Sequence, residues 1–543
     1  MKKIFTTISL AILATGISWG QGTENLMRMS SQNFSLGTAR SSAMGGAFTS
    51  LGADVSSMSI NPAGLGMYTR SEISISPGMR FGSTTSSYDG VAGYSNSTKE
   101  SKSKATLGSF GAVYSNGRFA LGIGSNRLAD FSSKRTVYGA NEGFSIGDMY
   151  AEQIYGIPEG NINSPDDDIY KAFFNYSPVL WEAIMGYQAA LLNPGHDPDT
   201  YTMLGVLNSG DMVAPQFNRI TNGAIDEYTI SGAYNLNNIL YFGLTVGIQD
   251  IFYKQFDRYS EVAAAGNTGT LHDFTYKNSL RMSGTGVNLK LGVTARPVSW
   301  FRVGLTYHSP TWMYMNEESF SDLTVYGSHY PSDARYGFSD TPLLVNDYNM
   351  RSPSRMMGGV SFTIINRIIV SADYERTWHG KMKYTSTLND YGYRPETLSD
   401  AVDNYGNIAL NIQTNGDIDL NNIITSSYRA TNNFRVGIEA QPIDFFFIRA
   451  GYSYKQSPYS SDIITYNGKK ASDYGSYQQF SGGLGYRNGR FSIDAAYVYG
   501  TTESLPYKFF DYTATDGYNV ASEGYTTTKH KNSNVILTLG YRF

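Results

Sequence analysis

The chain has 543 residues and no cysteine, and its 42 Lys and Arg against 46 Asp and Glu give a net charge of −4. Such a chain lacks the positive field that nucleic-acid binding requires, and it forms no disulfide, thiolate metal site or iron–sulfur cluster. A mean hydropathy of −0.30 excludes a bundle of membrane-spanning helices, but it does not exclude a membrane barrel, whose alternating strands average to nearly neutral hydropathy.

Residues 1–20 have the pattern of an export signal. Lys2 and Lys3 give a basic start, residues 4–17 are mostly apolar, and small residues precede Gln21. We therefore expect a signal peptide and a mature protein that starts at Gln21. An N-terminal membrane anchor is the alternative, although about 14 apolar residues are too few to span a bilayer.

Residues 21–66 lack strand-like alternation and are rich in Gly, Ala, Ser and Met. Within them, residues 39–51 are expected to form a short helix. This part of the chain therefore differs in kind from everything that follows it.

From about residue 70 onward, apolar residues stand at every second position, which is the period of a β-strand. One run has Phe242, Leu244, Val246 and Ile248 on one face, and Gly243, Thr245, Gly247 and Gln249 on the other. We expect the second face to line a wet lumen. The pattern predicts fourteen strands, over residues 70–82, 103–115, 118–131, 225–236, 239–256, 274–295, 300–312, 352–365, 368–378, 430–441, 445–456, 476–487, 490–500 and 531–543.

Alternation alone does not distinguish a membrane barrel from a soluble sandwich, because both have one apolar face. The connections favour the barrel, since short links such as Asn237-Asn238 alternate with long polar segments, the longest over about 132–224. The expected fold class is all-β, a 14-stranded antiparallel transmembrane β-barrel over residues 67–543 with both termini periplasmic. Because fourteen strands enclose a lumen too wide for side chains alone to fill, we expect residues 21–66 to form an N-terminal hatch inside it.

The long loop contains one candidate helix, over residues 178–192, with apolar residues at spacings of three and four. Two interpretations stay open at this point. The helix packs on the barrel rim, or it offers an apolar landing groove for a hydrophobic ligand.

The sequence offers little catalytic or metal-binding chemistry. Residues 143–147 match the G-x-S-x-G string, but the residues on both sides look like loop and not like the strand and helix of a nucleophile elbow. The acidic run at 166–168 lacks the spacing of a calcium loop and is interpreted as a solvated tip. No two histidines have metal-ligand spacing, and His308 is expected to line the lumen. We expect neither an enzyme nor a cofactor or metal.

Several short motifs occur along the mature chain in a specific order. They are ARSSAMGGAF at 39–48, GAD at 52–54, NPAGL at 61–65, GVTARP at 292–297, GLTYHSP at 304–310, ADY at 372–374 followed by Trp378, and RAGYSY at 449–454. In this order they resemble the FadL/TodX family of outer-membrane transporters for fatty acids and other hydrophobic compounds. The resemblance covers nearly the whole mature chain, strongly in the N-terminal part and weakly in the loops.

The resemblance implies a 14-stranded barrel plugged by an N-terminal hatch. The hatch-motif residues would be Asn61, Pro62 and Ala63, with Gly45 and Gly46. Proline fixes φ and the preceding asparagine favours a turn, so the motif should hold the hatch against the inner wall; an ordinary turn without a role in gating is the alternative.

In better-known members of that family the third strand is kinked and opens a lateral gap. The corresponding strand here, residues 119–131, contains Gly122 and Gly124 but no proline. The glycines allow a bulge, but the sequence does not indicate a lateral exit.

The leading hypothesis is passive outer-membrane transport of a hydrophobic small molecule, such as a long-chain fatty acid or an aromatic hydrocarbon, through a hatch-gated barrel. Expected partners are that ligand, outer-membrane lipid and lipopolysaccharide, and the barrel-assembly machinery, which would recognise the C-terminal aromatic Phe543. We expect a monomer and no nucleic acid. The alternatives are a surface barrel whose long loops bind a partner, and an outer-membrane hydrolase.

Overall fold

The computed structural model describes residues 22–30, 36–163, 170–174, 176, 180–194, 203–204, 206–268, 273–326, 337–386, 420–513 and 517–543. The predicted signal peptide and the acidic run at 166–168 lie outside these residues.

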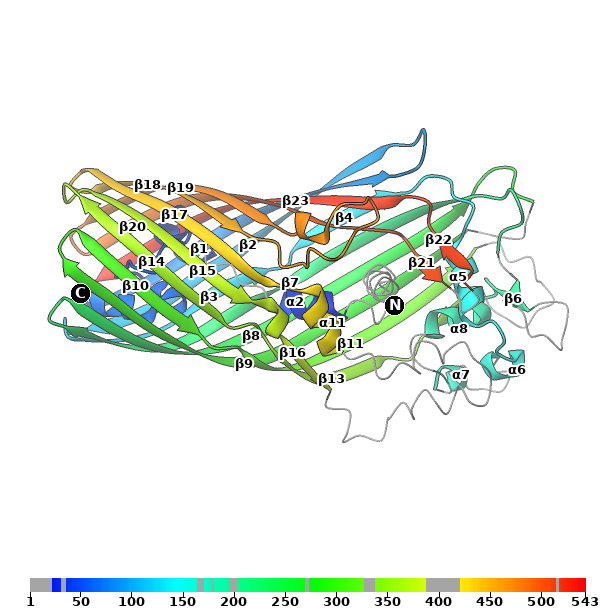
Figure 1. Ribbon diagram of the computed structural model, residues 1–543, viewed down its shortest axis with the longest axis horizontal. Coiled ribbons are helices and arrows are strands. Elements are labelled where there is room, and N and C mark those ends of the chain that lie inside the picture. The colour runs from blue at the N-terminus through cyan, green and yellow to red at the C-terminus, as the bar shows by residue number, and fades with distance from the viewer. Residues whose placement is uncertain are drawn as a thin grey trace.

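The described strands form one closed antiparallel barrel (Figure 1). Each wall strand pairs with the next one along the chain, and the last strand pairs with the first, with Ile73 opposite Tyr541. The fourteen wall strands are β1 (Glu72–Asp89), β2 (Asn96–Ser115), β3 (Phe119–Asp130) continued by β4 (Ser133–Tyr138), β7 (Val213–Leu236), β8 (Leu240–Ala263), β9 (Phe274–Val298), β10 (Phe301–His308) with β11 (Trp312–Val325), β13 (Leu344–Arg351) with β14 (Arg355–Ile364), β15 (Ile368–Trp378) with β16 (Lys383–Ser386), β17 (Ala430–Ile443), β18 (Phe446–Lys455), β19 (Tyr477–Asn488), β20 (Phe491–Tyr507) and β23 (Tyr525–Arg542). The predicted fold class and strand number are confirmed.

Helices and short strands lie inside the barrel or beyond one of its ends. The helices are α2 (Gly22–Met29), α3 (Ala39–Ala43), α4 (Ser57–Ile60), η2 (Pro62–Met67), α5 (Ile146–Gln153), α6 (Glu159–Ile162), α7 (Lys171–Phe174), α8 (Trp181–Gln188), η4 (His379–Lys381), α11 (Leu420–Ser427) and η5 (Ala471–Asp473). The short strands are β5 (Asn193–Pro194), β6 (Met203–Leu204), β12 (Phe338–Asp340), β21 (Asp511–Thr513) and β22 (Asn519–Ala521). No helix in this described set is long and apolar enough to cross a membrane.

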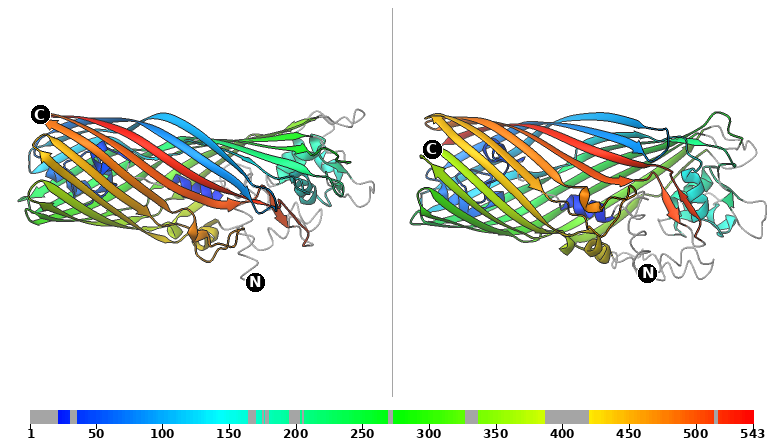
Figure 2. Two further views of the ribbon diagram at one scale, coloured as in Figure 1. Left: turned by 90° about the horizontal axis from the view of Figure 1, so that it is seen from above. Right: turned by 45° about the horizontal axis from the view of Figure 1, so that its top comes forward.

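The two ends of the barrel differ. Tight turns close one end; at Asn237 and Asn238 both φ angles are positive, 57° and 59°, as a two-residue hairpin of matching twist requires. The chain's C-terminus lies at this end, whereas α5 to α8 lie at the other, the long-loop end (Figures 1 and 2).

The outer wall carries an apolar band next to the tight turns. On β8 the outward side chains of Phe242, Leu244 and Ile248 are 42%, 47% and 45% exposed, and their inward neighbours are buried. Such a band is typical of a barrel that faces lipid.

Several strands are longer than the sequence pattern predicts, and three of them are the longest of the wall. β7, β8 and β9 have 24, 24 and 25 residues, more than twice the roughly ten that cross a bilayer. Beyond the band, polar residues such as Asp250, Lys254 and Arg258 interrupt the outward apolar row of β8, so the alternation weakens although backbone pairing continues. The expected spans 225–236 and 239–256 therefore stop short of the long-loop end, and the expected span 274–295 stops three residues short of Val298 at the tight-turn end.

Two predicted strands are interrupted in the structure. The strand expected over 300–312 breaks between β10 and β11 at Pro310, and the one over 352–365 begins after a break at Pro353. Proline cannot donate to a ladder, so each wall strand here consists of two pieces. Thr311 N donates to Ser352 Oγ at 2.9 Å and holds the two breaks side by side.

The band predicts an asymmetric response to charge. Leu537→Arg places a cation among lipid-facing residues of β23, at a cost of about 2–4 kcal/mol near the membrane midplane, and should lower the amount of heat-modifiable barrel in the membrane fraction. Ser101→Arg, exposed on the outer face of β2 and paired with Ser83 beyond the band, is the control and should assemble as wild type. Equal levels of all three proteins would contradict the assignment of this band.

Candidate functional site

Residues 36–67, here called the N-terminal segment, lie inside the barrel (Figure 2). Its short helix α3 begins at Thr38, whose hydroxyl accepts from Ser41 N and donates to Asp54 at 2.8 Å. The helix expected over residues 39–51 ends early, at Ala43, because Gly45 and Gly46 have φ angles of 67° and 75°. An added Cβ at Gly45 would also stand 3.0 Å from backbone atoms of Tyr452, so this turn lies directly on the wall.

The Asn61-Pro62-Ala63 motif makes hydrogen bonds within the N-terminal segment and one hydrogen bond to β9. Asn61 Oδ1 caps η2 by accepting from Ala63 N at 3.1 Å, and Pro62 occupies the first helical position. The Asn61 amide donates to Thr49 O at 2.6 Å and to Thr294 Oγ1 of β9 at 3.2 Å. The structure thus brings the motif to the inner wall, and its role in gating stays a prediction.

Charged groups of the wall hold the N-terminal segment from several sides. Arg40 makes a two-point contact with Glu439 of β17, at 2.9 and 3.0 Å, and Glu439 also accepts from Arg449 at 2.6 Å. On the neighbouring strand β15, the carboxylate of Asp373 accepts from Thr49 N at 2.8 Å. Buried charges are costly unless paired in this way, so the N-terminal segment and the wall satisfy each other.

A second polar group lies under α4 and η2. Glu227 of β7 is fully buried; it pairs with Lys290 and accepts from Ser59 at 2.8 Å. His308 Nε2 donates to Ile60 O at 2.9 Å. His308 therefore faces the lumen as expected, but it contacts protein there.

The polar side of β8 does not face water at this level. Thr245 and Gln249 are 0% and 1% exposed, because the N-terminal segment and the polar side chains beside it fill the lumen. The expectation of a wet lumen at these positions was wrong for this part of the barrel.

Inward-facing wall glycines were the residues that sequence reasoning missed. An added Cβ at Gly243 or Gly292 would stand 2.2 or 1.9 Å from Pro62 or Asn61, and one at Gly304 would stand 2.1 Å from Thr49 O. The available signal was glycine recurring at the polar positions of successive strands. Only residues without a side chain leave room for a backbone this close to the wall.

An apolar cluster lies in the lumen on the long-loop side of the N-terminal segment. The ladder of β8 and β9 gives its level: Gly243 and Gly292 pair beside the N-terminal segment, and Tyr253 and Met282 pair ten residues farther along. We call it the methionine cluster because eight of its buried residues are Met29, Met44, Met282, Met313, Met315, Met350, Met357 and Met382. Its other buried members are Leu26, Phe48, Leu51, Leu128, Ala129, Ile60, Ile225, Ile251, Tyr253, Leu280, Tyr348, Ile424 and Tyr428.

Helix α2 covers the methionine cluster on one side. Its Leu26 and Met29 are 2% and 0% exposed, and the guanidinium of Arg28 lies 4.9 Å from the ring centre of Tyr253. α2 also contacts α11. Both helices come from segments outside the ladder of the wall.

The backbone ladder of the wall is interrupted beside this cluster. β2 pairs with β3 only from Ser109 to Ser115, and its earlier residues pair with β1, while β4 pairs with β7. The register of β3 also shifts between Arg127 and Ala129. We call the unpaired boundary between β2 and β3/β4 the seam.

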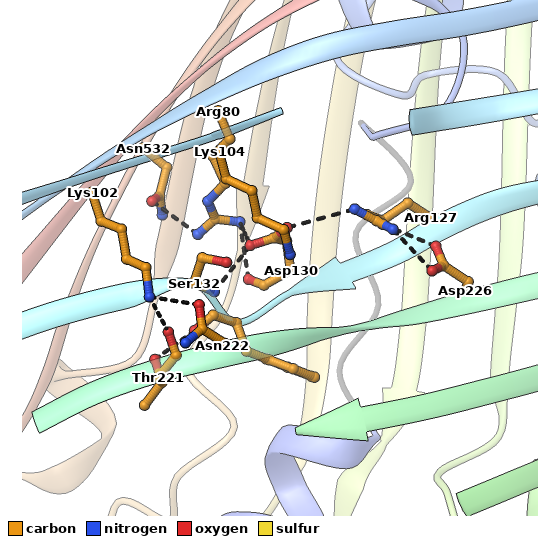
Figure 3. A network of polar contacts seen from close by, with 11 residues as sticks. Arg80, Lys102, Lys104, Arg127, Asp130, Ser132, Thr221, Asn222, Asp226 and Asn532 are labelled. Carbon is orange, nitrogen blue, oxygen red and sulfur yellow. Dashed lines mark hydrogen bonds and ion pairs between the residues drawn. The ribbon is translucent and has the colours of Figure 1, made fainter. Parts of the chain in front are cut away.

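Side chains bridge the seam (Figure 3). Asp130, whose side chain is 1% exposed, lies 3.4 Å from Arg80, 3.6 Å from Lys104 and 3.8 Å from Arg127. Lys102 Nζ donates to Thr221 O at 2.8 Å on the far side. The wall is thus closed here by side-chain contacts instead of backbone hydrogen bonds.

The third strand is irregular, but not at the two glycines where the sequence allows a bulge. Its irregularity is at residues 127–129 and not at Gly122 or Gly124, which pack against Met58 of the N-terminal segment. A bulge needs no proline, so the absence of proline was a poor guide.

The chain is similar to hydrocarbon transporters of known structure. The toluene transporter TodX of Pseudomonas putida shares 13% identity over 95% of this chain and 99% of its own, with a TM-score of 0.46. A FadL homologue of Pseudomonas aeruginosa shares 14% identity over 94% of this chain and 98% of its own, with a TM-score of 0.48. The toluene transporter TbuX of Ralstonia pickettii shares 15% identity over 95% of this chain and 100% of its own, with a TM-score of 0.44. No family model matches the chain, and no curated protein does.

The long-loop helices form a packed layer. Ala183, Ile184 and Tyr187 of α8 are at most 1% exposed and pack with Tyr276 and Leu323 at the strand ends. This supports the packing interpretation of the helix over the landing groove. The first residues of the predicted helix, 178–179, lie outside the described residues.

Ser145 of the G-x-S-x-G string has a structural role. It caps α5, the helix that follows it, by accepting from Gly147 N at 3.0 Å, and it donates to Glu261. The expectation of loop after the serine was wrong, but residues 143–144 before it are not a strand. The described residues contain no cluster of three or more His, Asp or Glu that could hold a metal.

Two buried carboxyls lie in the same loop layer. Burial raises the pKa of Glu142 to about 7, although Tyr88 OH and Glu523 N donate to this carboxyl. Burial likewise raises the pKa of Glu182 on α8 to about 7. Both carboxyls therefore titrate near neutral pH.

The wall glycines predict how the N-terminal segment can be displaced. Gly304→Val should push the backbone at Thr49 and Ser50 off the wall and make cells permeable to polar antibiotics. Gly358→Val is the control, because a Cβ there meets nothing within 4 Å. The readouts are heat-modifiable barrel and antibiotic sensitivity; equal sensitivity of both variants would contradict a seal at this contact.

Proposed function

We propose that this protein passively carries hydrophobic small molecules, such as long-chain fatty acids or aromatic hydrocarbons, across the outer membrane, with both termini periplasmic. The observation that carries the proposal is the methionine cluster. Barrel interiors are ordinarily polar, yet here eight methionines, five of them on wall strands, pack together and are at most 3% exposed.

Methionine suits a site that must accept more than one shape. Its side chain is unbranched and polarizable, so it repacks around different ligands. A compound that leaves water for such a surface gains roughly 25 cal/mol per Å² of apolar area. No energy source is needed for a ligand that moves down its own gradient.

The N-terminal segment acts in this proposal as the hatch. It lies between the methionine cluster and the tight-turn end, and its contacts with the wall include hydrogen bonds and ion pairs such as Arg40–Glu439. Their reversibility supports a plug that shifts without unfolding the barrel.

The seam supplies the proposed exit. Leu128 belongs to the methionine cluster, and the ring of Phe131 lies 5.6 Å from that of Tyr253. On the outer face, Leu107 of β2 is 39% exposed beside the start of the seam. Among the described residues, no backbone ladder joins the two sides of the seam beyond Ser109, so fewer backbone hydrogen bonds oppose its opening than oppose the opening of a paired boundary.

The alternatives receive less support. A display barrel gives no reason for an apolar cluster inside the lumen. For a hydrolase, Ser145 would have to be a nucleophile, but its hydroxyl is committed to Glu261 and to the cap of α5.

Polar substitutions in the methionine cluster should reduce uptake. Met315→Gln with Met357→Gln removes on the order of 1 kcal/mol of apolar contact, which is roughly fivefold in ligand affinity. Uptake of a radiolabelled long-chain fatty acid or of toluene should fall toward that of cells lacking the protein. The control pair is Met79→Gln with Met356→Gln, since both side chains are 41% exposed on the outer wall.

Uptake should be measured at equal amounts of folded barrel. Wild-type and deletion cells that take up every hydrophobic compound at one rate would overturn the transport proposal and favour surface binding through the loops.

Locking the seam should block lateral exit. The chain has no cysteine, so Glu100→Cys with Thr136→Cys can be joined across the seam by a short bifunctional thiol reagent. In the native protein Thr136 Oγ1 donates to Glu100 Oε1 at 2.7 Å, so the two positions are close enough to link. Uptake should fall on cross-linking and recover when the link is cleaved. Ser83→Cys with Ser101→Cys, neighbours on the paired β1–β2 ladder, is the control. Full uptake through a locked seam would mean that the ligand leaves along the barrel axis.

A further inference from the structure

Four cations gather on the outer face of β8 and β9, beyond the apolar band. Lys254 lies opposite Arg281 across the ladder, and Arg258 lies opposite Lys277 four residues farther along. Lys254 and Arg258 are exposed, and the side chains of Arg281 and Lys277 are 51% and 37% exposed. We call these four residues the cationic patch.

The arrangement is unfavourable without an anion. Like charges directly opposite each other on a sheet destabilise the pairing, and here two such pairs lie about 13 Å apart, at roughly 3.3 Å per residue. β11 offsets only part of the charge: Glu318 lies 3.5 Å from Arg281, and Asp322 lies 2.9 Å from Lys277. Four cations therefore face two carboxylates.

The height of the patch indicates which layer of the membrane it meets. Lys254 is six residues beyond Ile248, where the continuous apolar band of β8 ends, so it lies about 20 Å farther along the strand. With a strand tilt of 35–45° this is about 15 Å along the membrane normal. Acyl chains end below this height, and the charged sugars of an outer-leaflet glycolipid lie at it.

An aromatic ring orients two of the charges. Lys254 Nζ and the Arg281 guanidinium lie 5.4 and 5.9 Å from the centre of the Phe252 ring. Phe252 and Phe256 are themselves 36% and 41% exposed on this face. The patch thus combines cations, which can bind phosphate, with exposed apolar rings beside them.

We propose that the cationic patch is a binding site for the phosphate-bearing sugar headgroup of lipopolysaccharide. The proposal rests on the outer-membrane placement put forward above and is independent of transport. One phosphate would bridge Lys254 and Arg281, and a second anionic group would lie between Arg258 and Lys277. The site would fix the tall β7–β9 wall in the outer leaflet.

The test compares two pairs of substitutions in the full-length folded barrel. Lys254→Gln with Arg281→Gln removes one cross-strand pair of the patch. Arg118→Gln with Arg490→Gln removes two exposed arginines beside the tight turns and is the matched control. Binding of fluorescent rough-type lipopolysaccharide is measured in detergent, with phosphatase-treated lipopolysaccharide and inorganic phosphate as separate arms.

The patch variant should bind intact lipopolysaccharide about tenfold more weakly, because each cation near an anionic membrane surface contributes several-fold in affinity. The control should bind as wild type, and phosphatase treatment should remove the difference between them. Wild-type binding by the patch variant, equal losses in both variants, or complete competition by inorganic phosphate at matched concentration would overturn the proposal.

Arg258→Gln with Lys277→Gln provides an independent second variant, and heat-modifiability establishes that each protein is folded. Loss of lipopolysaccharide binding with normal uptake of hydrophobic compounds would leave the proposed function intact. If the wild-type protein binds lipopolysaccharide but takes up no hydrophobic compound, the transport proposal alone would be overturned.

Discussion

A β-strand in lipid must have hydrogen-bond partners on both edges, because no water is present to satisfy them. This constraint explains why β23 returns to β1 and closes the wall. Closure with fourteen strands then creates an interior that the wall's own side chains do not fill. The N-terminal segment, its ion pairs and the methionine cluster all lie in this interior.

The inner wall adapts to its contents strand by strand. Glycines at 243, 292 and 304 let the backbone of the N-terminal segment approach the wall, and buried groups such as Glu227 satisfy its polar atoms. Farther from the tight turns, the same inward positions carry methionine. One wall therefore presents a polar, closely fitted surface at one level and an apolar, adaptable one at the next.

The seam is a boundary where adjacent strands of the wall lack continuous backbone pairing, and it lies beside the methionine cluster. Pairing between β2 and β3 stops at Ser109 and Asn126, and contacts of Asp130 with three cations take over. Side chains and not a backbone ladder therefore close the wall at this boundary. The lumen, the seam and the outer lipid thus meet beside one apolar cluster.

The sequence by itself determined the fold class, the strand number and the difference between the two ends, because period two and turn residues are local signals. It did not reveal that β7 begins at Val213 and that β8 continues to Ala263, since backbone pairing persists where hydrophobic alternation weakens. It named Asn61 but not Thr294, and it placed a helix through Gly45. Only the tertiary structure decided which inward residues touch the N-terminal segment, where the methionines converge and where the ladder breaks, because these depend on contacts between residues hundreds of positions apart.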